Sequence, residues 1–211
     1  MMKDTVKANR SYGRFYGEDS WMIEDIVKAN RSYRRFHEDR RIDRETLREL
    51  VNLARLSPSA ANLQPLKYVI SADPELNKRI FPTLAWAGYL RPWMGPAEGE
   101  RPSAYIVILG DTQISRNFGC DHGIAAQSIM LGAAEKGLGG CMIGSIERDK
   151  LREVLSIPSR YEILLVLALG HAKEKVVLED VGPDGDIKYY RDENDVHHVP
   201  KRKLDEIVLG G

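Results

Sequence analysis

Long apolar runs, an excess of one charge and cysteine are all scarce in this sequence of 211 residues. No apolar run approaches the roughly 20 residues that a helix needs to cross a bilayer. The longest, residues 163–169, has the length of a strand. Lysine plus arginine and aspartate plus glutamate both total 31, so the net charge is zero. This balance argues against a general role on nucleic acids or membrane surfaces, which usually requires a basic excess.

Cysteine and histidine are too sparse for the sites they commonly build. Cys120 and Cys141 are too far apart for a CxxC motif and too few for a disulfide framework. His197 and His198 are adjacent, and neighbouring residues of a strand point to opposite faces, so we predict no metal site. The N-terminus is charged from Lys3 onward and lacks the apolar core of a signal peptide. We therefore expect a cytoplasmic protein.

The composition, with 43% hydrophobic and 29% charged residues, is typical of a globular domain. Apolar residues recur at helical spacing after Asp43, which suits an N-cap, and they predict one helix. A second helix is predicted after Asp121, which we also expect to act as a cap, and this helix is apolar nearly all round. Strands and helices interleave without regular βαβ units, so the predicted class is α+β. The expected strands are residues 66–70, 104–109, 141–143 and 163–169, with a hairpin over 187–199.

The N-terminal region contains an internal repeat. Residues 6–12 and 27–33 are both Val-Lys-Ala-Asn-Arg-Ser-Tyr. Because a solenoid needs several units, a single repeat near one end does not predict one. We interpret residues 1–21 as an extension and 22–211 as the complete domain. The alternative is a genuine N-terminal helix that packs on the body.

Two segments have residues suited to holding an anionic, flat ligand. Arg31-Ser32-Tyr33-Arg34-Arg35-Phe36 offers three guanidiniums, whose geometry matches phosphate. The alternative is a solvated charged face with the aromatic residues packed inward. In the second segment, residues 57–65, small residues allow close approach of the backbone, and the amides of Asn62 and Gln64 both donate and accept. The alternative there is an ordinary polar turn.

In this order and spacing, the two segments resemble those of the nitroreductase family of FMN-dependent NAD(P)H oxidoreductases. The resemblance runs from about Met22 to the C-terminus. It includes the Pro-Ser-Ala-Ala-Asn-x-Gln-Pro turn, the apolar helix after Asp121, the segment 139–144 and the basic C-terminus. It implies a central, mostly antiparallel sheet flanked by helices, in an intertwined homodimer with FMN at the subunit interface.

The family's functional positions can be transferred to this chain. Ile143 and Gly144 match the segment whose backbone N–H points at flavin N5, where a donor stabilises reduced flavin. Many members have arginine in place of Asn30, so Arg35 is a candidate replacement. The positions that match the FMN phosphate and ribityl contacts are Arg31, Ser32 and Arg34, with Arg202 at the basic C-terminus and Lys201 or Lys203 as its alternates. Those that match the turn reaching the flavin from the partner subunit are Pro58, Ser59, Ala60 and Asn62, and Gln64 matches an amide that faces the ring.

The resemblance also implies an activity. NAD(P)H would reduce FMN, and the flavin would pass electrons to a small organic acceptor such as a nitroaromatic or a quinone. The alternatives are reductive dehalogenation by a related flavoenzyme and FMN binding or sensing without turnover. Trp86, Tyr89 and Trp93 lie in a Gly/Pro-rich stretch. They suit either an aromatic lid over the flavin or core and dimer contacts.

Overall fold

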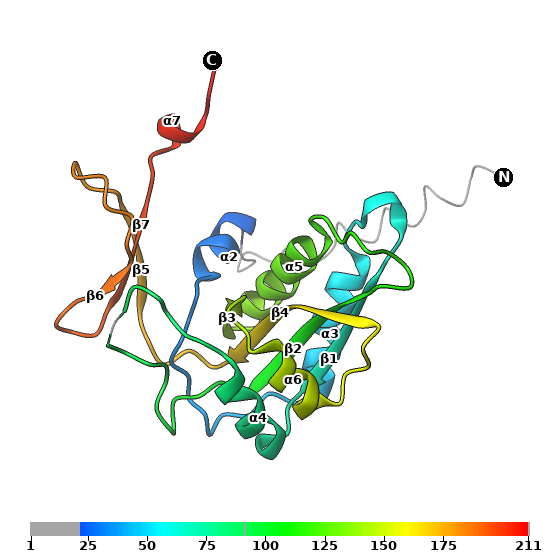
Figure 1. Ribbon diagram of the computed structural model, residues 1–211. Coiled ribbons are helices and arrows are strands. Elements are labelled where there is room, and N and C mark those ends of the chain that lie inside the picture. Colours follow the sequence, from blue (N-terminus) through cyan, green and yellow to red (C-terminus); the bar gives the residue numbers. More distant parts are fainter. Residues whose placement is uncertain (1–21, 91, 211) are drawn as a thin grey trace.

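A computed structural model describes residues 22–90 and 92–210, so the duplicated segment 1–21 lies outside the described residues. The main body is built on a four-stranded antiparallel sheet with the strand order β1-β2-β4-β3 (Figure 1). Its strands are β1 (Leu66–Ser71), β2 (Ala104–Asp111), β3 (Gly139–Ile143) and β4 (Tyr161–Gly170). The predicted mixture of helices and antiparallel strands is confirmed.

Helices cover both faces of this sheet, which explains why β2 and most of β4 are continuously apolar. Alternate residues of β2 enter two separate cores: Ile106 and Ile108 face one side, and Tyr105 and Val107 the other. The first core packs against α3 (Arg44–Leu56) and α5 (Asp121–Glu135). The second packs against α4 (Pro74–Ile80) and α6 (Arg148–Leu155).

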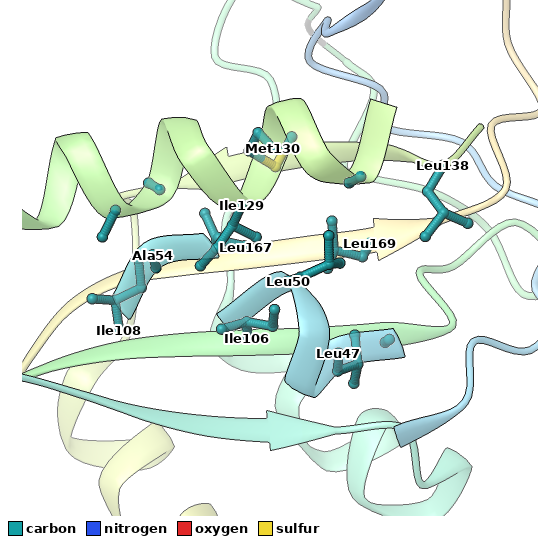
Figure 2. Close-up of a cluster of buried hydrophobic side chains, with 14 of the residues drawn as sticks. Leu47, Leu50, Ala54, Ile106, Ile108, Ile129, Met130, Leu138, Leu167 and Leu169 are labelled. Carbon is teal, nitrogen blue, oxygen red and sulfur yellow. The ribbon is translucent and has the colours of Figure 1, made fainter. Parts of the chain in front are cut away.

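Figure 2 shows the first core, where side chains of α3 and α5 meet over β2 and β4. Leu47 and Leu50 of α3 and Ile129 of α5 are completely buried. Gly132 allows the two helices to approach closely, because a Cβ at this position would lie 2.2 Å from a methyl group of Leu53. The apolar helix therefore lies on the core as expected, but it is not fully covered.

Local signals set the helix ends largely as the sequence predicts. The Asp43 carboxylate caps α3 by accepting a hydrogen bond from the backbone N–H of Thr46 at 2.7 Å. Gly137, with φ +70°, ends α5, and the next residue, Leu138, donates its N–H to the Ala133 carbonyl at 2.8 Å.

A second, three-stranded sheet projects away from the main body in Figure 1. It has the order β5-β7-β6, formed by β5 (Val176–Asp180), β6 (Tyr190–Arg191) and β7 (His197–Lys201). The antiparallel pairing of β6 with β7 confirms the predicted hairpin, although its first strand is shorter than expected. The parallel partner β5 was not predicted from the sequence.

The remaining elements are short. Helix α2 (Ile23–Ala29) precedes the arginine segment, and α7 (Leu204–Ile207) follows β7 near the C-terminus. Two 3-10 turns, η2 (Ala60–Asn62) and η3 (Phe81–Thr83), complete the described elements. No helix among the described residues is both long and apolar enough to cross a membrane.

Candidate functional site

The arginine segment is attached to the edge strand β3. The Tyr33 N–H donates to the Gly140 carbonyl at 2.9 Å, and Ser32 forms a parallel bridge with the same glycine. A Cβ at Gly139 would lie 2.8 Å from the Tyr33 ring, so the glycine makes room for this contact. Two segments that are far apart in the sequence, residues 31–34 and 139–144, are thereby brought together.

Beside this junction lies a cavity of about 330 Å³ between the arginine segment, α5, β3 and the second sheet. Three cationic side chains line it, and none of its lining residues is acidic. A cavity with this charge favours an anionic ligand. The lining residues are Asn30, Arg31, Ser32, Arg34, Gln127, Met130, Met142, Tyr189, His197, Val199 and Lys201.

Arg34 is the buried centre of this arrangement, with 8% of its surface exposed. Its guanidinium lies 4.7 Å from the ring centre of Tyr189 and donates to the Ser32 carbonyl at 3.1 Å. The same Nη1 lies 3.3 Å from Nε2 of His197. Because arginine can only donate, Nε2 is the acceptor, and the imidazole proton is assigned to Nδ1.

Two buried donors at this cavity have no hydrogen-bond partner in the described part of the chain: Nδ1 of His197 and Nε of Arg31. Buried polar atoms are rarely left unpaired, so each is a place for a ligand atom or water. Burial lowers the pKa of the Arg31 guanidinium, which no described carboxylate pairs with. A phosphate bound in this cavity would offset the desolvation of the guanidinium. These residues therefore fit the FMN phosphate and ribityl chain.

Asn30 and Arg35, the two candidates for the additional phosphate contact, lie in different places. Asn30 lines the cavity. Arg35 instead points at Glu100, with contacts of 2.7 and 2.8 Å, and at Asp195 at 3.1 Å. Hydrogen bonds from Arg35 are the main reason that the pKa of Glu100 falls to about 2. Arg35 thus holds the second sheet to the body and is not among the residues that line the cavity.

A smaller cavity of about 140 Å³ adjoins the first, because Arg34 and Met142 line both. Ile143 and Gly144 line it, as does Trp86. A Cβ built at Gly144 would meet no atom within 4 Å, so the space beside this peptide is open. The segment predicted to hold the N5 donor therefore lies next to the cavity that Arg31 and Arg34 line.

The turn over residues 58–64 lies elsewhere. It precedes β1, whereas Gly144 follows β3, and these two strands form opposite edges of the sheet. Three strand spacings separate them across the sheet, so they are at least about 14 Å apart. Pro58, Ser59 and Gln64 line a third cavity that shares no lining residue with the other two. Within one chain, the turn therefore does not join the arginine segment.

Asp121 holds this turn, which corrects the expectation that it caps α5. Cys120 is at the N-cap position and makes no side-chain cap. The buried Asp121 carboxylate instead accepts from the Ser59 hydroxyl at 2.6 Å and from the Ala60 N–H at 3.0 Å. The Ser59 hydroxyl also accepts from the Gln64 N–H at 2.9 Å, so one acid fixes both ends of the turn.

The backbone of the turn is strained. Ala61, Asn62 and Gln64 have φ values of 49°, 53° and 51°, a left-handed region that such residues rarely adopt. Strain of this kind persists only where the surroundings enforce it, and it gathers at functional sites. Asn62 and Gln64 are exposed and their side chains contact each other at 3.2 Å, so the turn presents both amides at the surface of the chain.

The C-terminal cation that lines the cavity is Lys201, which the sequence offered as an alternate to Arg202. Arg202 itself follows β7 and does not line the cavity.

The three aromatic residues of the Gly/Pro-rich stretch do not form a single lid. Trp86 is buried in the second core, with only 9% exposed. Tyr89 packs against Tyr189 with ring centres 5.0 Å apart, and Trp93 stacks under Arg191.

The burial of His197 makes a testable prediction about pH. Burial, reinforced by the Arg34 charge, lowers the pKa of His197 from 6.5 to about 4. Between these values the unfolded chain binds a proton that the folded chain does not, so stability is lost as the pH falls from about 6.5 to about 4. At 1.36 kcal/mol per pKa unit the loss is at most about 3 kcal/mol. Urea unfolding of wild type and His197→Gln across this range measures it. The variant should show a flatter profile, and identical profiles would contradict the assignment.

Comparison with known proteins bears on this geometry. The sequence pattern of the Nitroreductase family matches residues 27–89 and 100–171, which is more than half of the chain. The chain belongs to the nitroreductase family. A protein of Archaeoglobus fulgidus, whose name provisionally describes an NADH dehydrogenase/NAD(P)H nitroreductase, is 29% identical over 147 residues. That match covers 66% of this chain and 79% of the relative.

Solved structures show the same nitroreductase fold. An FMN-dependent nitroreductase from Clostridium difficile R20291 superimposes with a TM-score of 0.58 at 25% identity, covering 71% of this chain and 87% of the other. A nitroreductase family protein from Streptococcus pneumoniae TIGR4 has a TM-score of 0.66 at 19% identity, with 90% of this chain and all of the other covered. The second likeness concerns the fold alone.

Some residues that line the 330 Å³ cavity are absent from the sequence-based prediction. Gln127 and Met130 come from a helix face that spacing alone assigns to the core, and Tyr189 comes from an unremarkable stretch before the hairpin. His197 was considered only as half of a metal pair. Neighbouring residues of a strand point to opposite faces, and for this reason the sequence predicts no metal site at His197 and His198. The same alternation implies that one of the two histidines faces inward.

Proposed function

We propose that this nitroreductase family member is an FMN-dependent oxidoreductase that transfers electrons from NAD(P)H to a small organic acceptor. The observation that carries the proposal is the 330 Å³ cavity, lined by three cations and no acid, with two unpartnered buried donors. The FMN-dependent nitroreductase from Clostridium difficile supports it by name, as does the relative from Archaeoglobus fulgidus.

In this proposal the chain binds and orients the cofactor. Arg31, Arg34 and Lys201 bind the phosphate, His197 donates from Nδ1, and Asn30 completes the polar lining. When bound, FMN supplies the hydride and electron transfer itself. The open backbone at Ile143–Gly144 lies in the adjoining cavity, where an N–H donor would favour reduced flavin. No side-chain acid or base is assigned to the chemistry.

The proposal includes a homodimer with FMN at the interface. One chain supplies the cavity, and its own turn lies at least about 14 Å away across the sheet. The strained, exposed amides of Asn62 and Gln64 are suited to complete the site of a second subunit. Apolar side chains left uncovered in the single chain support an interface: Met22, Ile23, Ile124, Leu204 and Leu209 are between 38% and 90% exposed.

The visible spectrum of the purified protein tests the activity. We expect a yellow protein whose flavin band bleaches when NADH or NADPH is added without oxygen and returns when a nitroaromatic or a quinone is added. The same behaviour is expected of a chain that begins at Met22, because we propose that residues 1–21 are an extension outside the domain. Stopped-flow absorbance with each nucleotide and each acceptor measures both half-reactions.

Each outcome of this experiment has a distinct meaning. A yellow protein that neither nucleotide bleaches would favour FMN binding or sensing without turnover over catalysis. A colourless protein that takes up no added FMN would reject the proposal. Loss of FMN on removal of residues 1–21 would show that the first repeat belongs to the functional domain.

A further inference from the structure

A larger cavity, of about 500 Å³, lies away from the proposed flavin site. It is enclosed by α4, the loop before β2 and the first residues of β2, and it shares no lining residue with the cavities beside the arginine segment. Its size is in the range of small-molecule sites. The residues that decide its chemistry are Glu38, Asn77, Phe81, Arg101, Ser103 and Tyr105.

Three polar groups of this lining are buried without a hydrogen-bond partner in the described part of the chain. They are Nε of Arg101, the hydroxyl of Ser103 and the hydroxyl of Tyr105. Ser103 is 8% exposed and Tyr105 only 1%. All three belong to residues that line this one cavity. Buried polar groups are almost always paired, so three unpaired groups in the wall of one cavity indicate a ligand or ordered water.

Neighbouring side chains do not satisfy these groups, because they are already engaged. The Asn77 amide accepts from the Ser71 hydroxyl at 2.6 Å and donates to the Ser103 carbonyl at 2.8 Å. The Glu38 carboxylate accepts from the backbone N–H groups of Gly99 at 2.6 Å and Arg101 at 3.3 Å. The polar side chains beside the three groups therefore have other partners, and the three groups stay unpaired in the cavity wall.

Arg101 gives the cavity its preference for a carboxylate. Its guanidinium is stacked 4.6 Å from the ring centre of Phe81, which fixes its plane, and it forms no ion pair with a described residue. A planar guanidinium with an unpaired Nε matches the two oxygens of a carboxylate. Three acids and three cations line the cavity: backbone N–H groups hold the Glu38 carboxylate, and Asp39 and Glu98 at the exposed rim are matched in number by Arg41 and Lys78.

We propose that this cavity is a second ligand site, which binds a small carboxylate carrying a hydroxyl or carbonyl group. The carboxylate pairs with Arg101, and the second polar group reaches the hydroxyls of Ser103 and Tyr105. Burial raises the pKa of Tyr105, so its hydroxyl stays protonated and donates. The proposal does not rest on the FMN function, because no residue of the flavin site takes part.

The probe is 4-hydroxybenzoate, whose carboxylate and hydroxyl lie at opposite ends of a flat ring. Titration calorimetry on the full-length protein as purified should give a dissociation constant of about 1 mM or tighter. Arg101→Gln should weaken binding at least about 10-fold. Tyr105→Phe, which keeps the ring, should weaken it about 5-fold. The uncharged 4-hydroxybenzamide should bind to the wild-type protein no more tightly than 4-hydroxybenzoate binds to Arg101→Gln. The matched control is Arg79→Gln, an exposed cation of α4 outside the cavity, which should change nothing.

Flavin absorption recorded during the titration separates the two sites. Binding that leaves the flavin spectrum unchanged and is lost in Arg101→Gln supports the second site, whether or not the protein reduces FMN. Binding that shifts the flavin spectrum and survives Arg101→Gln places the probe at the flavin and overturns the proposal. Absence of binding to wild type also overturns it, since the cavity then holds only water.

Discussion

Replacing Arg31 with alanine is expected to weaken FMN binding about 30-fold, without unfolding the protein. Arg31 lines the cationic cavity, its Nε is buried without a partner, and no described carboxylate pairs with its guanidinium. In the free protein its Nη2 donates to the Val27 carbonyl of the short helix α2 at 2.5 Å, and losing this bond should lower the free energy of unfolding by only about 1 kcal/mol. Loss of a partly buried charge contact to phosphate costs about 2 kcal/mol, which corresponds to about 30-fold in affinity. Fluorescence titration of the apoprotein with FMN measures the change.

Arg35→Ala is the matched control, because it removes a neighbouring guanidinium that faces away from the cavity. Arg35 binds Glu100 and Asp195, so its loss should lower the free energy of unfolding by about 1–3 kcal/mol and leave FMN affinity within about 3-fold of wild type. Arg31→Ala is thus expected to change mainly the affinity for FMN, and Arg35→Ala mainly the free energy of unfolding. The reverse result, with FMN lost in Arg35→Ala and kept in Arg31→Ala, would place the phosphate on the other side of the segment.

The fold was predictable from the sequence where a local pattern and the tertiary environment agree. β4 is a continuous apolar run because helices cover both faces of the sheet, and Asp43 caps α3 because its carboxylate reaches the nearest free N–H. β5 was missed because its pairing with β7 joins residues about 20 positions apart in parallel, and no turn signal marks such a pair.

The candidate site was predictable only in part, for a physical reason. The cations could be found because guanidinium groups clustered in sequence indicate an anion site. The role of Asp121 could not, because its position at the start of a helix equally suits a cap, and only the fold shows that Ser59 and Ala60 reach its carboxylate first. The cavity around Arg101, Ser103 and Tyr105 left no motif, because its lining residues come from segments that are far apart in the sequence.

A mixed dimer is expected to recover one FMN site from two variants that each lose both. The first variant, Arg31→Ala/Lys201→Ala, removes two cations from the cavity and keeps the turn. The second, Asn62→Gly/Gln64→Gly, removes both amides of the turn and keeps the cavity. Glycine adopts the positive φ of these two positions without strain, so the backbone of the turn is preserved. Each homodimer should retain little FMN.

When the two chains are co-expressed with different tags and the mixed dimer is isolated, one of its two sites combines the intact cavity of the second chain with the intact turn of the first. The other site combines the two damaged parts. Absorbance should therefore report one FMN per dimer, half of the wild-type content. If each site were built within a single chain, every site of the mixed dimer would carry one damaged part, and it would bind no more FMN than the homodimers. If the turn did not contact the cofactor, the glycine variant alone would keep its full flavin content. The recovery of half the sites is thus expected only if residues 58–64 of one subunit complete the cationic cavity of the other.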